Sequence, residues 1–144
     1  MNWADGVEDE VRRLLCAAGV PSVVAIGTFD GVHLGHRALL RAAAAAARNQ
    51  DLRCLAVTFS PRPDVVWGAS ALPNICPLAE RVARLHRAGA DRVVVLPFSK
   101  EFAAIPYEVF AEMLTMCLQM RTLYVGSDFA LGADREGTPA KLRA

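Results

Sequence analysis

Long apolar runs are missing from this 144-residue sequence. No stretch approaches the roughly 20 apolar residues that a membrane-spanning helix needs, which argues against a membrane protein. The N-terminus, MNWADGVEDEVRRLL, is acidic and has no basic segment followed by an apolar one, so we expect no secretory signal. An excess of one charge is also missing, because the net charge is +1. No global basic field would therefore recruit nucleic acid or an anionic membrane surface, and any anion site must be local.

Cysteine pairs at metal-binding spacing are absent as well. The four cysteines lie far apart and form no C-x-x-C pair, which argues against a structural zinc site. Most of them fall within apolar segments, where a free cysteine behaves as a small hydrophobic residue. We therefore expect reduced, buried thiols in a cytoplasmic protein, at Cys16, Cys54, Cys76 and Cys117.

The residues that are present predict an α/β fold. Hydrophobic residues make up 53% and charged residues 22% of the chain, which is typical of one compact domain. Buried apolar runs predict strands near 22–27, 52–59, 92–96 and 121–126, and helical patterns predict helices at 7–18, 34–48, 77–88 and 107–118. We expect a Rossmann-like parallel sheet flanked by helices, with the first strand central. The helix at 7–18 is expected at the edge of the domain.

The segment VVAIGTFDGVHLGH, at 23–36, has the pattern of a phosphate-binding site. A buried strand passes through a glycine-bearing turn into an alanine-rich helix, whose first turn offers free N–H groups and the positive end of the helix dipole. His33 and His36 stand at this helix start, where imidazoles could donate hydrogen bonds to phosphate oxygens. From the residues alone, two alternatives stay open: two structural histidines, or a metal site with two histidine ligands.

Two neighbouring segments bear on the same site. Arg37, Arg41 and Arg48 form one stripe of the helix at 34–48, which we interpret as a solvated face. Arg37 is the exception, because a positive charge in the first turn opposes the helix dipole. After the second strand, prolines at 61, 63, 73 and 77 predict a long ordered loop at a strand end, where α/β folds bind ligands. Trp67 in this loop either covers an aromatic ligand or anchors the loop.

Three ordered motifs resemble a known family. GTFDGVHLGH is similar to the H-x-G-H signature of nucleotidylyltransferases, and its form F-D-G-V-H-x-G-H resembles the adenylyltransferase module of bacterial FAD synthetase, a bifunctional riboflavin kinase/FMN adenylyltransferase. TFSPRP, at 58–63, is similar to the T-F-x-P-H-P of that family. VGSDF, at 125–129, together with Gly132 and Gly137, resembles its V-G-x-D-F-x-F-G-x-x-x-x-G.

The resemblance implies a nucleotidylyltransferase-type fold and an FMN adenylyltransferase, which transfers AMP from ATP to FMN and gives FAD and diphosphate, with Mg²⁺. It implies small-molecule substrates and no nucleic-acid or membrane partner. His33 and His36 are implied as catalytic, and no residue is assigned to a metal. The residues implied in binding ATP and FMN are Gly27, Thr28, Phe29, Asp30, Gly31, Gly35, Thr58, Pro61, Arg62, Gly126, Asp128 and Phe129. Asp30 could instead cap the helix, and Asp128 could serve a turn.

The sequence departs from the family pattern in several places. Arg62 stands where the family has histidine, and arginine can hold a phosphate through two hydrogen bonds but cannot change its protonation state. Leu131 replaces an aromatic residue. The family continues into an S-S-T-x-I-R-like segment and a riboflavin kinase domain, neither of which lies in these 144 residues. We therefore expect a single, C-terminally incomplete domain at 1–144 that binds nucleotide but turns over poorly.

Two alternative functions stay open at this point. One is a truncated or degenerate homologue that binds nucleotide or flavin without turnover. The other is a related nucleotidylyltransferase that acts on another phosphate substrate, because the H-x-G-H motif does not select flavin by itself.

Overall fold

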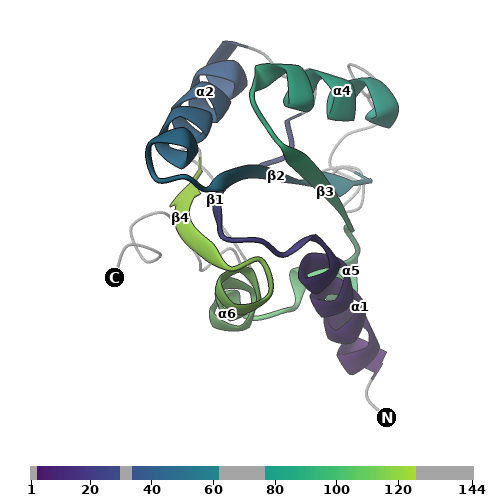
Figure 1. Cartoon of the computed structure of the whole chain (residues 1–144). Helices are drawn as coiled ribbons and strands as arrows, with labels where there is room; N and C mark the ends of the chain where they lie inside the picture. Colours follow the sequence, from purple (N-terminus) through teal and green to yellow (C-terminus); the bar gives the residue numbers. More distant parts are fainter. Residues whose placement is uncertain (1–2, 30–33, 62–76, 126–144) are drawn as a thin grey trace.

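The computed structural model describes residues 3–29, 34–61 and 77–125. Its centre is a four-stranded sheet in the order β3-β2-β1-β4, in which all neighbouring strands pair in parallel (Figure 1). The parallel sheet, its four strands and the interior position of the first strand are confirmed. The strands are β1 (Ser22–Ile26), β2 (Arg53–Ser60), β3 (Arg92–Pro97) and β4 (Met120–Tyr124).

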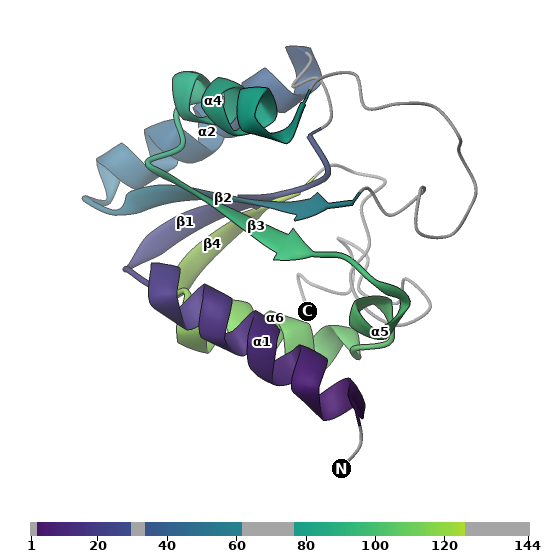
Figure 2. The same cartoon turned by 90° about the vertical axis from the view of Figure 1, so that its right-hand side faces the viewer.

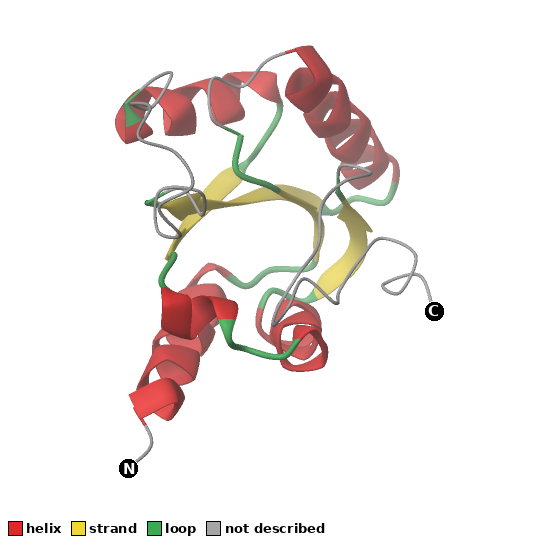
Figure 3. Ribbon diagram, turned by 180° about the vertical axis from the view of Figure 1, so that it is seen from behind, coloured by secondary structure: helices red, strands yellow, loops and turns green. Residues whose placement is uncertain are grey.

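Helices cover both faces of this sheet. Helices α2 and α4 lie together on one face, and α1, α5 and α6 lie on the other (Figure 2). Seen from behind, the sheet lies between these two helical layers (Figure 3). The helices are α1 (Trp3–Ala18), α2 (Leu34–Asn49), α4 (Leu78–Ala88), α5 (Lys100–Ala103) and α6 (Tyr107–Cys117).

The sheet separates two hydrophobic cores, because successive strand residues point to opposite faces. In β1, Val23 and Ala25 pack against α2, whereas Val24 and Ile26 pack in the core on the opposite face. In β1, residues of both faces are fully buried, which explains why this strand reads as a continuous apolar run rather than an alternating one. The outer strands β3 and β4 are only partly buried. The small side chains of the alanine run in α2 allow that helix to lie close on the sheet.

Helix α1 is longer than predicted, because it begins at Trp3, one turn earlier than expected. It packs against α5, α6 and β3, which is an edge strand of the sheet. Its residues Val11 and Leu15 are fully buried in the core on that face of the sheet. The amphipathic pattern of the segment was read correctly, but periodicity alone does not tell which surface the apolar face covers.

The expectation of four reduced cysteines is wrong. Cys16 and Cys117 form a disulfide between the ends of α1 and α6, with their Cα atoms 4.3 Å apart. A sequence separation of 101 residues hides this pairing, which arises because the two helices pack side by side. Cys54 does agree with the expectation, since it is a buried free thiol. Burial, together with the nearby Asp91 carboxylate, raises the pKa of this thiol to about 11. Cys76 lies outside the described residues.

Local signals mark several helix ends. Ser99 caps α5 by accepting a hydrogen bond from the backbone N–H of Phe102, and α6 begins directly after Pro106. Gly89 ends α4 with φ +130°, and a Cβ atom there would lie 2.8 Å from the Cβ of Ala44. Glycine at this position therefore lets the end of α4 approach α2 closely. In the part of the chain that the structure describes, no helix combines the length and apolarity needed to cross a bilayer.

Candidate functional site

The strand order β3-β2-β1-β4 predicts a ligand site beside β1. The chain moves outward from β1 through β2 to β3 and then returns to β4 on the other side of β1. In open α/β sheets, ligands bind at such a reversal, next to the carboxyl ends of the strands. The predicted motifs begin at the ends of β1, β2 and β4, which are neighbours in the sheet, so the three motifs start along one edge as expected.

The loop after β1 is anchored at its start. The backbone N–H of Gly27 donates to the carbonyl oxygen of Val57 at 3.1 Å, which extends the pairing of β1 with β2 by one residue. Phe29 then takes φ +54° and buries its ring, with 1% of the residue exposed. A positive φ is uncommon for a bulky residue and costs about 1–3 kcal/mol, so the surrounding packing must hold it. A Cβ atom at Gly27 would lie 3.3 Å from this ring, which makes glycine the residue that fits here.

His36 lies against this same ring. It occupies the first turn of α2 and is half-buried, and its imidazole meets the ring of Phe29 edge-on, with centroids 5.1 Å apart and the planes at 87°. The Nδ1 atom of His36 is buried. Phe29 therefore packs against a histidine that stands at the positive end of α2, where no acidic residue occupies the first turn.

A buried hydrogen-bond network joins the first two motifs. The Thr58 hydroxyl donates to the carbonyl oxygen of Thr28 at 2.7 Å. Nη1 of Arg81 donates to the same carbonyl at 2.8 Å and to the Thr58 hydroxyl oxygen at 3.3 Å. Arg81 is only 2% exposed although it carries a full charge. The network fixes the backbone of the β1 loop against the end of β2 and against α4.

Arg81 is not among the site residues that the sequence predicts. It comes from α4, between the inward-facing positions Leu78 and Leu85, at spacings of three and four residues. These spacings place its side chain on the apolar face of an amphipathic helix. An arginine on the apolar face of a helix is the sequence pattern that could have identified this residue. A buried guanidinium needs hydrogen-bond acceptors, and the neighbouring loop supplies them.

The other predicted binding residues are less enclosed or are not described. Gly35, in the first turn of α2, and Pro61, directly after β2, are exposed. The remaining predictions fall outside the described residues, namely Asp30, Gly31, His33, Arg62, Trp67, Gly126, Asp128 and Phe129. The roles of all these residues stay predictions.

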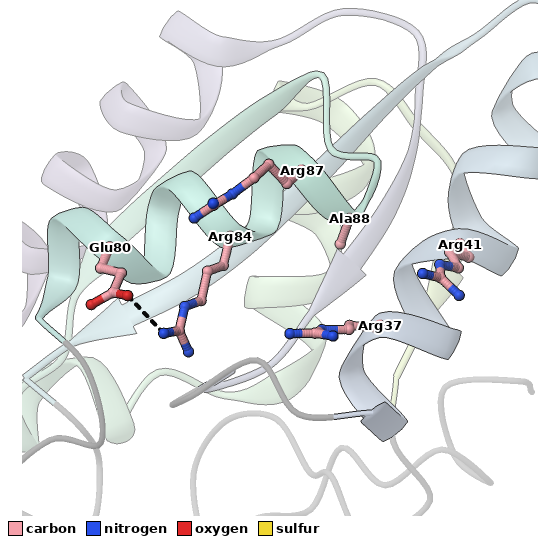
Figure 4. Close-up of a pocket in the computed structure, with 6 residues that line it drawn as sticks. All are labelled: Arg37, Arg41, Glu80, Arg84, Arg87 and Ala88. Carbon is pink, nitrogen blue, oxygen red and sulfur yellow. Dashed lines mark hydrogen bonds and ion pairs between the residues drawn. The ribbon is translucent and has the colours of Figure 1, made fainter.

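A cavity opens next to the loop, between α2 and α4. Its volume is about 480 Å³, and Arg37 and Arg41 of α2 line one side (Figure 4). Opposite them, α4 contributes Glu80, Arg84, Arg87 and Ala88. Arg84 forms an ion pair with Glu80 at 2.6 Å. Arg37 directly follows His36 in the first turn of α2, but His36 itself does not line this cavity. Among the residues described, no group of three His, Cys, Asp or Glu side chains could hold a metal ion.

Comparisons with known proteins agree with the three motifs. A family model described as FAD synthetase matches residues 17–144. The bifunctional riboflavin kinase/FMN adenylyltransferase of Escherichia coli K12 is 37% identical over 117 residues, which cover 80% of this chain and 37% of the relative. The Bacillus subtilis protein of the same name is 32% identical over 119 residues, 81% of this chain and 38% of the relative. This chain therefore spans less than half the length of these relatives.

A solved structure has the same fold. A crystal structure of a protein from Streptococcus pneumoniae, named there as a macrolide-efflux protein, matches with a TM-score of 0.77 and 30% sequence identity. The match covers 88% of this chain and 50% of that chain. It supports the parallel sheet with helices on both faces.

Proposed function

The chain belongs to the FAD synthetase family, and we propose that it is an FMN adenylyltransferase, which transfers AMP from ATP to the phosphate of FMN. The observation that carries this proposal is the loop after β1, whose H-x-G-H histidine is held on Phe29 at the reversal of the strand order. The proposal concerns the adenylyl transfer and not the riboflavin kinase activity that appears in the names of the relatives.

The reaction that we propose is a displacement at the α-phosphorus of ATP. An oxygen of the FMN phosphate forms a new bond to this phosphorus while the bond to the bridging oxygen of the β-phosphate breaks, and diphosphate leaves with that electron pair. The attacking phosphate is already an anion, so no general base is required. Catalysis then consists of positioning the two phosphates and stabilising the negative charge that moves to the diphosphate.

The described residues suit this task. His36 is oriented by Phe29 at the positive end of α2, where an imidazole N–H can donate to a phosphate oxygen. We propose the same role for His33 from its place in the motif. Thr28 and Thr58 are held by Arg81, which keeps the loop backbone in one conformation for its N–H groups to face the phosphates. Magnesium would supply additional neutralisation of charge on the phosphates, and we propose that it enters with ATP as part of the substrate.

Location in the cytoplasm is part of this proposal, because the cytoplasm supplies ATP. The disulfide between Cys16 and Cys117 is a feature that reducing compartments rarely retain, so it does not support that location.

The experiment follows FAD by chromatography after the chain is incubated with ATP, Mg²⁺ and FMN. We expect FAD formation that falls by about 10²–10³ in rate when His33 and His36 are both replaced by Ala, the range for losing charge-stabilising donors. ATP affinity, measured by calorimetry, should fall as well. The loss of the edge contact with Phe29 should cost only about 0.5–1.5 kcal/mol of stability. ATP binding without any FAD would instead favour the alternative of a homologue that binds without turnover.

A further inference from the structure

The cavity between α2 and α4 has a composition that the proposed reaction does not explain. We call it the arginine groove, and its lining residues are Arg37, Arg41, Glu80, Arg84, Arg87 and Ala88. The four arginines face a single carboxylate, in a chain whose net charge is only +1. A solvated helix face carries charges of both signs, so this local imbalance needs a physical reason.

Two pairs of arginines, one on α2 and one on α4, line the groove. Arg37 and Arg41 lie four residues apart on α2, and Arg84 and Arg87 lie three residues apart on α4, so each pair is stacked on one helix face. The two helices connect consecutive parallel strands on the same face of the sheet and therefore run in the same direction. Gly89 allows the end of α4 to pack closely against Ala44 of α2, and both arginine pairs line the cavity between these helices. In Figure 4, Arg37 extends from α2 toward α4, whereas Arg87 extends along α4.

The charges in the groove are only partly compensated. Arg84 is paired with Glu80, but within residues 3–29, 34–61 and 77–125 the structure gives no ion pair to Arg37, Arg41 or Arg87. Arg37 also stands in the first turn of α2, where the helix dipole adds to its positive potential. Like charges around one cavity repel one another, and an anion bound among them would remove this repulsion.

We propose that the arginine groove binds a diphosphate or triphosphate group, at a site separate from the loop that ends at His36. Guanidinium groups hold phosphates through paired, charge-assisted hydrogen bonds, and several of them suit a ligand with several phosphates. The volume of about 480 Å³ lies within the range of small-ligand pockets. A small anion is favoured over nucleic acid, because the net charge of the chain is only +1. The inference needs no step of the proposed adenylyl transfer.

The test measures the binding of inorganic pyrophosphate, ATP and adenosine by calorimetry at low salt. The variant R41Q/R87Q removes two charges from the groove and leaves both the Arg84–Glu80 pair and the residue next to His36 in place. The matched control R12Q/R48Q removes two exposed arginines that do not line the groove. We expect pyrophosphate to bind at least tenfold more weakly to R41Q/R87Q, whereas R12Q/R48Q stays within twofold of the unaltered chain. Adenosine should show no difference among the three.

Two further measurements distinguish free pyrophosphate from a nucleotide as the ligand, and the arginine groove from the loop at His36 as the binding site. Replacing Glu80 by Gln should strengthen pyrophosphate binding, because it removes the carboxylate that competes for the arginines. An equal loss for pyrophosphate and ATP in R41Q/R87Q identifies the diphosphate unit itself as the ligand, and a larger loss for ATP than for pyrophosphate identifies the phosphate tail of a nucleotide. If R41Q/R87Q binds both as tightly as its control does, the proposal is overturned. If His36→Asn abolishes pyrophosphate binding while R41Q/R87Q does not weaken it, the groove proposal fails and the proposed function stands.

Discussion

Arg81 offers the sharpest test of how the loop after β1 is positioned. We predict that Arg81→Met lowers the rate of FAD formation by about 10²-fold, since misplacing reacting groups by about 1 Å has an effect of that size. Methionine retains much of the apolar stem of arginine but donates no hydrogen bond. The carbonyl oxygen of Thr28 would then keep only the Thr58 hydroxyl, at 2.7 Å.

The effect on stability should be much smaller than the effect on activity. The two hydrogen bonds from Nη1, at 2.8 and 3.3 Å, involve a charged donor, and such bonds contribute about 1.5–3 kcal/mol each. This loss is partly offset, because the variant no longer has to bury a charged guanidinium, whose residue is 2% exposed in the folded chain. Burying that charge carries a desolvation penalty. We therefore expect a net loss of about 0–2 kcal/mol, which is a few degrees in the thermal midpoint for a domain of this size.

The assay combines FAD chromatography, ATP calorimetry and thermal unfolding on the same preparations. Arg48→Met is the matched control, because Arg48 is exposed in the last turn of α2 and should leave all three measurements unchanged. Thr58→Val, alone and combined with Arg81→Met, completes a double-mutant cycle in which we expect coupling of at least about 0.5 kcal/mol in activity. Activity within threefold of the unaltered chain, together with a midpoint lowered by ten degrees, would show that Arg81 only stabilises the fold and would refute the positioning argument.

Two further predictions concern the cysteines. Because the folded-state pKa of the Cys54 thiol is raised to about 11 from an ordinary value of 9.0, the folded chain keeps a proton that the unfolded chain loses between these values. Stability should therefore fall by about 2–3 kcal/mol as pH rises from 9 to 11, and urea unfolding of Cys54→Ala should lack this loss. For the disulfide, replacing Cys16 and Cys117 by Ser should lower the free energy of unfolding by up to about 4–5 kcal/mol, the value for a loop of roughly 100 residues. Peptide mapping without reductant that finds both thiols free would contradict the second prediction.

Sequence patterns were sufficient for the strands and for the longer helices, whereas the short helix α5 was not predicted. Continuous apolar runs such as Val23–Ile26 could only be strands buried on both faces, and parallel pairing followed from the helices between them. The H-x-G-H motif placed His36 at the start of α2, and the structure puts it there. These predictions succeed because they depend on spacings of two to four residues, which the backbone geometry of strands and helices fixes locally.

Contacts between distant segments depended on the tertiary structure. No local pattern near Cys16 predicts its disulfide with Cys117. Similarly, Arg81 donates hydrogen bonds to Thr28 and Thr58, which lie 53 and 23 residues away in the sequence. Local spacing predicts that each helix has an apolar face. It does not predict which helix or loop that face contacts.

The arginine stripe of α2 shows the same division between sequence and structure. Arg41 is exposed, as the sequence predicted for a solvated face, and Arg37, the exception in that prediction, is exposed as well. Only the packing of α4 against α2 decides that they share a cavity with Arg84 and Arg87. The sequence determines the charge and the face of each helix, because both follow from the 3.6-residue period. The tertiary structure decides which charged faces lie together, because it sets how the helices pack on the sheet. That packing depends on shape complementarity across the whole core, as in the fit of Gly89 against Ala44.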